Sequence, residues 1–191
     1  PDGEPVWGPA LSQLYRNSGE GTFADVAAAA GVLNDRYCKG AAWGDFNEDG
    51  FTDLYVSNYE QANRLYMANG DGTFTDVATQ LGVDAPSSSF ATWWWDYDND
   101  GDLDIYVAGF DDDIGSFAAG LFGEGTGKAG VARLYRNDGS GGFDDVTAEA
   151  GLDAPALVMG AGFGDLDGDG YPDIVLGTGS VDFDAVTPNL A

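Results

Sequence analysis

Histidine is absent from the 191-residue sequence, and cysteine occurs once, as Cys38. The lack of histidine removes the commonest general base, the Ser-His and Cys-His nucleophile pairs and histidine-based zinc sites. A single cysteine excludes an intrachain disulfide and leaves two alternatives, of which a buried free thiol is favoured over an intermolecular bridge. These absences argue against an enzyme, and the sequence offers no catalytic residue.

Basic residues are also scarce, with 7 Lys and Arg against 33 Asp and Glu and a formal net charge of −26. Nucleic acid and anionic membranes bind clustered positive charge, so neither is an expected partner. No apolar run is long enough to cross a membrane and there is no signal peptide, although a chain that opens on Pro1 leaves secretion open. With 43% hydrophobic residues, the chain is nevertheless able to fold as one domain with a sizeable core.

A nine-residue acidic pattern, D-x-[DN]-x-D-G-x-x-D, occurs three times: DFNEDGFTD at 45–53, DYDNDGDLD at 96–104 and DLDGDGYPD at 165–173. Oxygen-bearing side chains at positions 1, 3, 5 and 9, with glycine at position 6 for a sharp turn, are what a hard cation needs from one short loop. Asp, Asn and Gly also form ordinary turns, but three copies in register predict about three Ca²⁺ sites. Because Asn47 stands where the other copies have aspartate, we expect loop 45–53 to bind most weakly.

An EF-hand loop opens with the same residues but requires a bidentate glutamate at position 12 and flanking helices. Position 12 is Val56, Val107 or Leu176 in the three copies, each within a short run of apolar, mostly β-branched and aromatic residues. Such runs predict strands, so each acidic loop is expected to be the turn of a β-hairpin.

A second motif repeats with the same spacing. The segments LYRNSGEGTFADVA, LYMANGDGTFTDVA and LYRNDGSGGFDDVT begin at residues 14, 65 and 134, and their offsets of 51 and 69 residues match those of the acidic loops. Each unit reads as four short strands, expected in the first complete unit at 41–44, 54–56, 63–66 and 74–77, with a Gly-x-Gly hairpin between the last two. The repeats predict an all-β fold of four-stranded antiparallel β-propeller blades, with about three blade equivalents.

The acidic loop together with L-Y-x-N…G-x-G-x-F-x-D-V resembles the FG-GAP/VCBS repeat family over roughly residues 12–178, in the UnbV-like and cartilage-acidic-protein-like varieties that are related to the integrin α-subunit head. The resemblance implies that each loop binds Ca²⁺ through side chains at positions 1, 3, 5 and 9 and through the main-chain carbonyl at position 7. The implied ligands are Asp45, Asn47, Asp49, Phe51, Asp53, Asp96, Asp98, Asp100, Asp102, Asp104, Asp165, Asp167, Asp169, Tyr171 and Asp173.

The repeats also divide the chain. The expected parts are an extended arm at 1–11, a half-blade at 12–32, blades at 40–83 and 90–152, a half-blade at 159–178, and an extension or further repeat at 179–191. Three blade equivalents are too few to close a propeller and would leave strand edges open. The expected partners are therefore other copies of the chain or the rest of a longer propeller, and a protein or glycan ligand also stays open.

Two departures from the repeat stand out. Trp93 and Trp95 replace small residues and, by strand alternation, point away from the face that carries Trp94. We expect them to pack against a neighbouring blade and not to form an aromatic platform for a sugar or a protein. The longer second offset reflects an inserted loop at 109–130, expected on the face opposite the acidic loops, for which a tolerated insertion and a binding loop are equal alternatives.

The resemblance implies a non-enzymatic, calcium-binding, extracellular or cell-surface module that serves as a scaffold, in adhesion or in self-assembly. A carbohydrate-binding propeller is the alternative, because Trp93, Trp95 and Tyr97 are able to stack on sugar rings. A polysaccharide lyase is least favoured, since nearly every recurrent aspartate is a ligand or a turn former.

Overall fold

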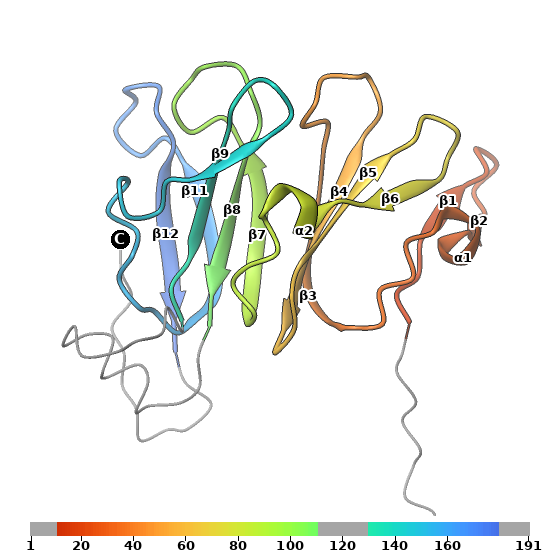
Figure 1. Cartoon of the computed structure of the whole chain (residues 1–191), viewed down its shortest axis with the longest axis horizontal. Coiled ribbons are helices and arrows are strands. Elements are labelled where there is room, and N and C mark those ends of the chain that lie inside the picture. The colour runs from red at the N-terminus through yellow and green to blue at the C-terminus, as the bar shows by residue number, and fades with distance from the viewer. Residues whose placement is uncertain (1–10, 111–129, 180–191) are drawn as a thin grey trace, which may run out of the picture.

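A computed structural model describes residues 11–110 and 130–179 of the chain. Almost all of the expected arm, the inserted loop and the C-terminal extension lie outside these residues. The strands form four antiparallel sheets that stand side by side as blades (Figure 1). Two sheets have four strands and two have two strands, so the described residues contain three blade equivalents, as the repeats predict.

The blades follow one another along the chain, and within each the strands pair in chain order. The first half-blade contains β1 (Tyr15–Asn17) and β2 (Phe23–Asp25). The first complete blade contains β3 (Tyr37–Gly44), β4 (Asp53–Tyr59), β5 (Arg64–Ala68) and β6 (Phe74–Asp76). The second complete blade contains β7 (Ser89–Trp95), β8 (Asp104–Gly109), β9 (Arg133–Asn137) and β10 (Phe143–Asp145). The last half-blade contains β11 (Val158–Gly164) and β12 (Asp173–Thr178).

The second strand of each complete blade is buried on both faces. Every residue of β8 and all but the last of β4 are buried. Neighbouring blades cover both faces of these strands, so apolar side chains are favoured at consecutive positions and not only at alternate ones. This explains the unbroken runs Leu54-Tyr55-Val56 and Ile105-Tyr106-Val107.

The hydrophobic cores lie between the blades. One cluster of buried side chains joins each pair of neighbours, and the middle cluster joins the two complete blades. In that cluster Trp94 stacks on Phe46 with ring centroids 5.9 Å apart and meets the edge of Tyr55 at 6.3 Å. A Cβ at Gly44 would lie 2.6 Å from the Trp94 ring, so this close approach between blades requires glycine.

A one-turn helix, which the sequence analysis did not predict, follows the fourth strand of the first two units: α1 (Ala27–Ala30) and α2 (Ala78–Leu81). The main-chain N–H of Ala78 donates to the Asp76 carboxylate at 3.2 Å, and Gly82 ends α2 with a φ of 71°. The first half-blade repeats this arrangement. The aspartate of F-x-D-V therefore holds the first turn, and the glycine that follows supplies the left-handed residue at its end.

Trp93 and Trp95 are packing residues, as predicted. Trp93 stacks on Phe163 of the last half-blade, with ring centroids 5.4 Å apart. Trp95 meets the same phenylalanine ring edge-on, with a centroid distance of 5.4 Å and an interplanar angle of 63°. Both indoles also contact Tyr106. The two tryptophans thus fill the space between the second complete blade and the last half-blade.

Cys38 is exposed, so the prediction of a buried thiol is wrong. The residue lies near the start of β3, where a register shift between Cys38 and Gly40 interrupts the pairing with β4. Its sulfur approaches the Gly40 carbonyl oxygen at 3.6 Å. The inter-blade cluster reaches β3 further along the strand, at Ala42, which the sequence pattern alone did not reveal.

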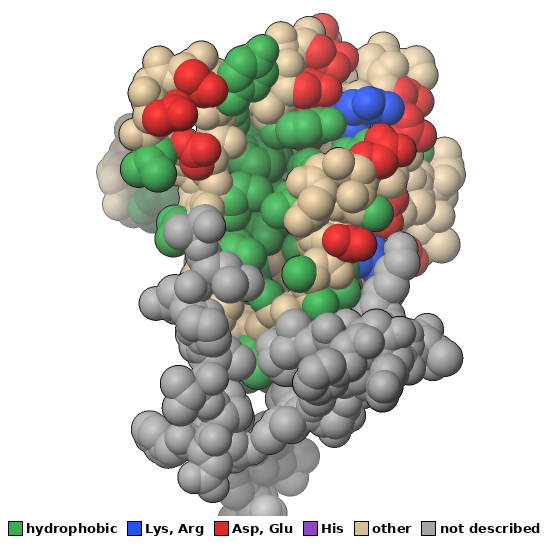
Figure 2. Space-filling model, turned by 90° about the vertical axis from the view of Figure 1, so that its left-hand side faces the viewer, with side chains coloured by type: hydrophobic (Ala, Val, Ile, Leu, Met, Phe, Trp, Pro, Cys, Tyr) green, Lys and Arg blue, Asp and Glu red, His purple; other side chains and the backbone are tan. Residues whose placement is uncertain are grey.

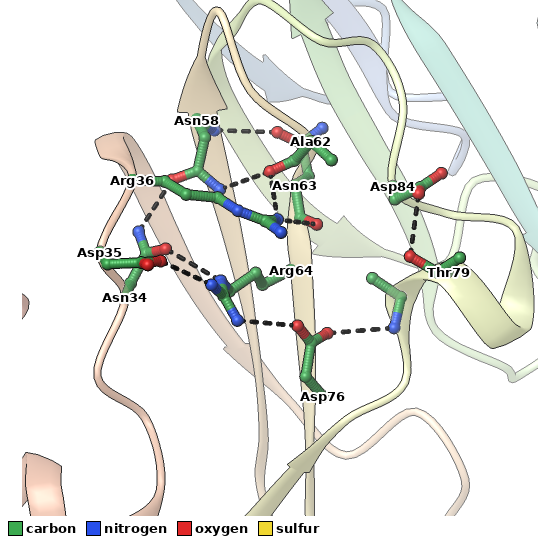
Figure 3. A network of polar contacts seen from close by, with 11 residues as sticks. Asn34, Asp35, Arg36, Asn58, Ala62, Asn63, Arg64, Asp76, Thr79 and Asp84 are labelled. Carbon is green, nitrogen blue, oxygen red and sulfur yellow. Dashed lines mark hydrogen bonds and ion pairs between the residues drawn. The ribbon is translucent and has the colours of Figure 1, made fainter.

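A polar network, also not foreseen, joins the connection between the first half-blade and β3 to the other strands of the first complete blade (Figure 3). Arg64 donates to Asn34, Asp35 and Asp76 at 3.1, 2.7 and 3.1 Å. Asn34 in turn donates to Asn58 at 2.8 Å, and both asparagines are buried. Satisfied buried polar groups rigidify their surroundings, so this network holds the connecting segment against the first complete blade.

Candidate metal loops

The three acidic loops lie at the same end of the molecule, and each joins the first two strands of a blade (Figure 1). Position 12 falls within β4, β8 and β12, so the predicted β-hairpins are confirmed. The glycines at position 6, Gly50, Gly101 and Gly170, have φ values of 86°, 100° and 91°. Only glycine adopts such angles without strain, which explains why the pattern keeps it.

The loops share one hydrogen-bond frame. The carboxylate at position 1 accepts the main-chain N–H of positions 5 and 6; in the second loop Asp96 accepts from Asp100 and Gly101, both at 3.0 Å. The carboxylate at position 5 accepts the N–H of position 7, here Asp102 at 2.9 Å. The same bonds recur in the other two loops. The frame curls the main chain around its carboxylates.

The aspartate at position 9 fastens each loop to its blade. Asp104 is fully buried and accepts the N–H of Tyr97 at 3.1 Å and that of Asn137, at the end of β9, at 2.8 Å. Asp53 makes the same two bonds, again with the third strand at 2.8 Å. Asp173 keeps the bond from within its loop, at 2.7 Å, and no third strand pairs with β12 among the described residues.

The second loop gathers negative charge that its own donors do not satisfy. One oxygen from each of Asp96, Asp98 and Asp104 lies within 4.8 Å of the other two. Oδ1 of Asp98 is buried and has no hydrogen-bond partner among the described residues. Burial raises the pKa of Asp104 to about 6, and burial together with the nearby Asp100 raises the pKa of Asp98. Converging carboxylates and an unpaired buried oxygen fit a hard divalent cation.

The other two loops differ from each other. In the third, oxygens of Asp165, Asp167 and Asp169 also lie within 4.8 Å of one another. Loop 45–53 has no such group of three acidic side chains in the described structure. There the Asn47 amide donates to Asp49 at 2.9 Å, so a hydrogen bond replaces a repulsion between carboxylates. All fifteen implied ligands stay predictions. Six of them belong to the two convergent groups, and the other nine are Asp45, Asn47, Asp49, Asp53, Asp100 and Asp173 and the carbonyls of Phe51, Asp102 and Tyr171.

Position 4 of each loop also has a special conformation, which the sequence analysis missed. The φ values of Glu48, Asn99 and Gly168 are 55°, 60° and 79°. Asn and Gly tolerate the left-handed region, and their presence at position 4 was the available signal. Asn99 also donates its amide N–H to the main-chain carbonyl of Gly170 at 3.0 Å, which links the second and third loops.

Asp104→Asn is expected to lower the free energy of unfolding by up to about 2 kcal/mol. One of its two buried N–H donors would face an amide NH₂ group, at a cost of about 1–3 kcal/mol, and relief of the repulsion with Asp96 and Asp98 offsets part of that cost. Urea denaturation in excess chelator measures this without a contribution from bound cations. Asp173→Asn is the matched control, since it has the same position in the repeat but is exposed, and it should change the value by less than about 0.5 kcal/mol. Equal effects would contradict the fastening role assigned to position 9.

Three segments of the chain, 6–56, 45–107 and 111–176, match the FG-GAP-like repeat. They cover most of the sequence, and each ends at position 12 of an acidic loop. The chain belongs to the FG-GAP-like repeat family. The match confirms the resemblance noted from the motifs, and the acidic hairpins are a regular part of these FG-GAP-like repeats.

The FG-GAP-like repeats of this chain are similar to cartilage acidic protein 1. Identity is 30% over 172 residues with the Xenopus tropicalis protein, 29% over 170 with that of Mus musculus and 29% over 171 with that of Homo sapiens. Each alignment covers 87% of this chain and 24–25% of the relative, so the chain spans about a quarter of the length of the curated relatives it matches. Within the described residues, no helix is both long and apolar enough to cross a bilayer.

Proposed function

We propose that these FG-GAP-like repeats form a calcium-stabilised, non-enzymatic extracellular module with a scaffold or adhesion role. The observation that carries the proposal is the row of acidic hairpins at one end of the molecule, two of which bring three carboxylates to a common point. Ca²⁺ takes about 6–8 oxygen ligands in flexible geometries, which short acidic loops supply more readily than the strict octahedron of Mg²⁺.

A bound cation would supply the positive charge that the second loop lacks. Asp98 would contribute its unpaired Oδ1, together with oxygens of Asp96 and Asp104. Asp104 would at the same time keep its bond from Asn137, so that one carboxylate connects the ion to the third strand of the blade. This double role supports a structural ion that holds strands together.

The extracellular part of the proposal rests on two observations. The similar proteins are named cartilage acidic protein 1. This chain is acidic as well, with a net charge of −26, and that charge disfavours binding to nucleic acid or to anionic membranes. Secretion also agrees with a dependence on Ca²⁺, because about millimolar extracellular Ca²⁺ would keep sites with a Kd of about 10 µM occupied.

The carbohydrate-binding alternative has less support, because two of its three aromatic residues, Trp93 and Trp95, pack against Phe163 and Tyr106. The lyase alternative has no additional support, since the carboxylates at positions 1, 5 and 9 are engaged in the loop frame. Scaffolding or adhesion is therefore favoured over both.

Titration calorimetry of chelator-treated protein with Ca²⁺ tests the proposal. We expect about three ions per chain, with the weakest site in loop 45–53, where Asn47 stands among the implied ligands. Mg²⁺ at the same concentration is the control and should bind more weakly. Absence of heat and of any spectral change at millimolar Ca²⁺ would overturn the proposal.

Asn47→Asp should have opposite effects in the two forms of the protein. It should tighten Ca²⁺ binding at loop 45–53 about tenfold, because ligand charge tunes affinity. In chelator it should destabilise the fold by about 0.5–1 kcal/mol, since the bond donated to Asp49 is lost and a carboxylate repulsion appears near the surface. Calorimetry and urea denaturation measure the two effects, and a change of the same sign in both would contradict this assignment of loop 45–53.

A further inference from the structure

Each complete blade places a tyrosine of its third strand against the preceding blade. Tyr135 of β9 pairs with Ile105 of β8, is 2% exposed, and donates its hydroxyl to the Ala85 carbonyl at 2.9 Å. Tyr66 of β5 pairs with Leu54 of β4 and is buried against the first half-blade, where its hydroxyl has no hydrogen-bond partner among the described residues. The third-strand tyrosine therefore fills the space between two blades.

The last half-blade has a hollow in the corresponding place. Its volume is about 220 Å³, and it lies beside β12. Five of its lining residues repeat the surroundings of Tyr135: Tyr106, Leu152, Ala154, Ile174 and Leu176 correspond to Tyr55, Val83, Ala85, Ile105 and Val107. Figure 2 shows hydrophobic side chains running down the middle of this face, below acidic side chains. The hollow is thus shaped by the same residue types that hold a tyrosine elsewhere.

Other groups beside the hollow also lack the neighbours that their equivalents have. Among the described residues β12 pairs with β11 alone, whereas β4 and β8 each pair with a third strand on that side. Phe163 is 48% exposed, while the equivalent Trp94 meets Phe143 of the fourth strand at 6.3 Å. Leu166 is 87% exposed, while the equivalent Phe46 stacks on a tryptophan of the next blade.

The opposite end of the molecule carries the complementary two strands. β1 and β2 are the third and fourth strands of a blade, and no first or second strand pairs with them among the described residues. Residues 14–17 read Leu-Tyr-Arg-Asn, identical to 134–137 around β9. Tyr15 is 54% exposed, Phe23 62% and Trp43 49%. Tyr15 and Phe23 occupy the repeat positions of Tyr135 and Phe143, whose equivalents are missing beside β12 among the described residues.

We infer that β1 and β2 of one copy complete the last half-blade of a second copy. In the register of β9 on β8, Tyr15 lies opposite Ile174 of the second copy and enters the hollow, where its hydroxyl reaches the Ala154 carbonyl. The Asn17 N–H then donates to Asp173, as Asn137 does to the equivalent aspartate. The partner strand thereby completes the hydrogen-bond frame of the third acidic loop.

The same arrangement covers the exposed aromatic residues. Phe23 meets Phe163 of the second copy, as Phe143 meets Trp94 within a blade. Leu166 of the second copy covers Trp43, as Phe46 covers Trp94. One contact of this kind buries every exposed group described at both ends, and its repetition links copies head to tail into a ring or a filament.

Electrostatics sets a condition on this association. Each copy carries a formal charge of −26, so bare copies repel one another. Screening is effective at about 0.15 M salt, where the Debye length is about 8 Å. Association therefore strengthens with salt and with Ca²⁺, whereas an interface held by ion pairs would weaken with salt.

Sedimentation of two blocked variants and their mixture tests the inference. Tyr15→Asp blocks the donor strand, and Leu176→Arg blocks the hollow. In about 0.15 M salt with Ca²⁺, we expect wild-type protein to form species larger than a monomer, each variant alone to be monomeric, and an equimolar mixture to form a dimer and nothing larger. A monomeric wild type at high micromolar concentration would overturn the inference, because another segment would then cover the hollow.

A peptide experiment keeps the test valid if Leu176→Arg fails to fold. A synthetic peptide of residues 11–26, which carries β1 and β2, should bind the Tyr15→Asp protein, whose hollow is intact. The same peptide with Tyr15→Ala should bind at least about tenfold more weakly, because it lacks the buried ring. Equal binding of the two peptides, or none, would overturn the inference. Neither readout measures Ca²⁺ affinity, so assembly can fail while the proposed function holds.

Discussion

Removal of Ca²⁺ is expected to lower the melting temperature of the protein by about 10–20 °C. A site at about 100 times its Kd stabilises the folded state by about 2.7 kcal/mol. Two loops with convergent carboxylates together give about 5 kcal/mol, and each kcal/mol is worth about 2–4 °C for a chain of this size. Without the cation, the repulsion among Asp96, Asp98 and Asp104 persists in the folded state.

Differential scanning calorimetry in chelator and in millimolar Ca²⁺ measures this shift. Sodium chloride at matched ionic strength is the control, because it screens charge without occupying the loops. Asp98→Asn removes the carboxylate with the unpaired oxygen and should lose about half of the calcium-dependent shift, since it disables one of two convergent loops. A melting temperature that is the same in chelator and in Ca²⁺ would exclude a structural cation.

Trp94→Ala is expected to lower the free energy of unfolding by about 3–5 kcal/mol. The indole is 8% exposed, stacks on Phe46 and donates its Nε1–H to the Ala42 carbonyl at 3.1 Å. Its removal opens a cavity between the two complete blades, and Gly44 beneath the ring has no side chain to fill it. Urea denaturation in saturating Ca²⁺, at concentrations where the protein is monomeric, measures the loss.

Trp43→Ala is the matched control, because Trp43 has the same position in the first complete blade but is 49% exposed. Trp43→Ala should lower the free energy of unfolding by less than about 1 kcal/mol. Comparable losses for the two tryptophans would show that the repeat position, and not the blade contact, determines the stability. Such a result would contradict the placement of the cores between the blades.

The order of strands and the acidic hairpins could be predicted from the sequence because both are local. A blade is a series of hairpins between neighbouring segments, and runs such as Leu54-Tyr55-Val56 recur in register with the loops before them. The glycine at position 6 and the Gly-x-Gly pair encode positive φ angles directly. Contacts between residues that are close in the sequence are therefore visible as repeated sequence motifs.

Two features that could not be predicted depend on contacts between blades, and a third depends on a side-chain contact within one loop. The exposure of Cys38 depends on where the inter-blade cluster reaches β3. Among the described residues, two of the three acidic loops bring three carboxylates together. Loop 45–53 does not, because the Asn47 amide donates a hydrogen bond to Asp49 there. The hollow beside β12 became visible only when its lining could be compared with the surroundings of Tyr135. None of these features gives rise to a repeating pattern in the sequence.

The placement of the cores between blades also bears on how such a chain grows. A blade alone has two apolar faces and no interior, whereas every blade added to an array brings one new core with it. Tandem duplication of a 51-residue unit therefore yields a product with a core of its own from the first generation, before any substitution adapts the copies to each other. Divergence such as Trp93 and Trp95 in place of small residues can follow later, one blade contact at a time.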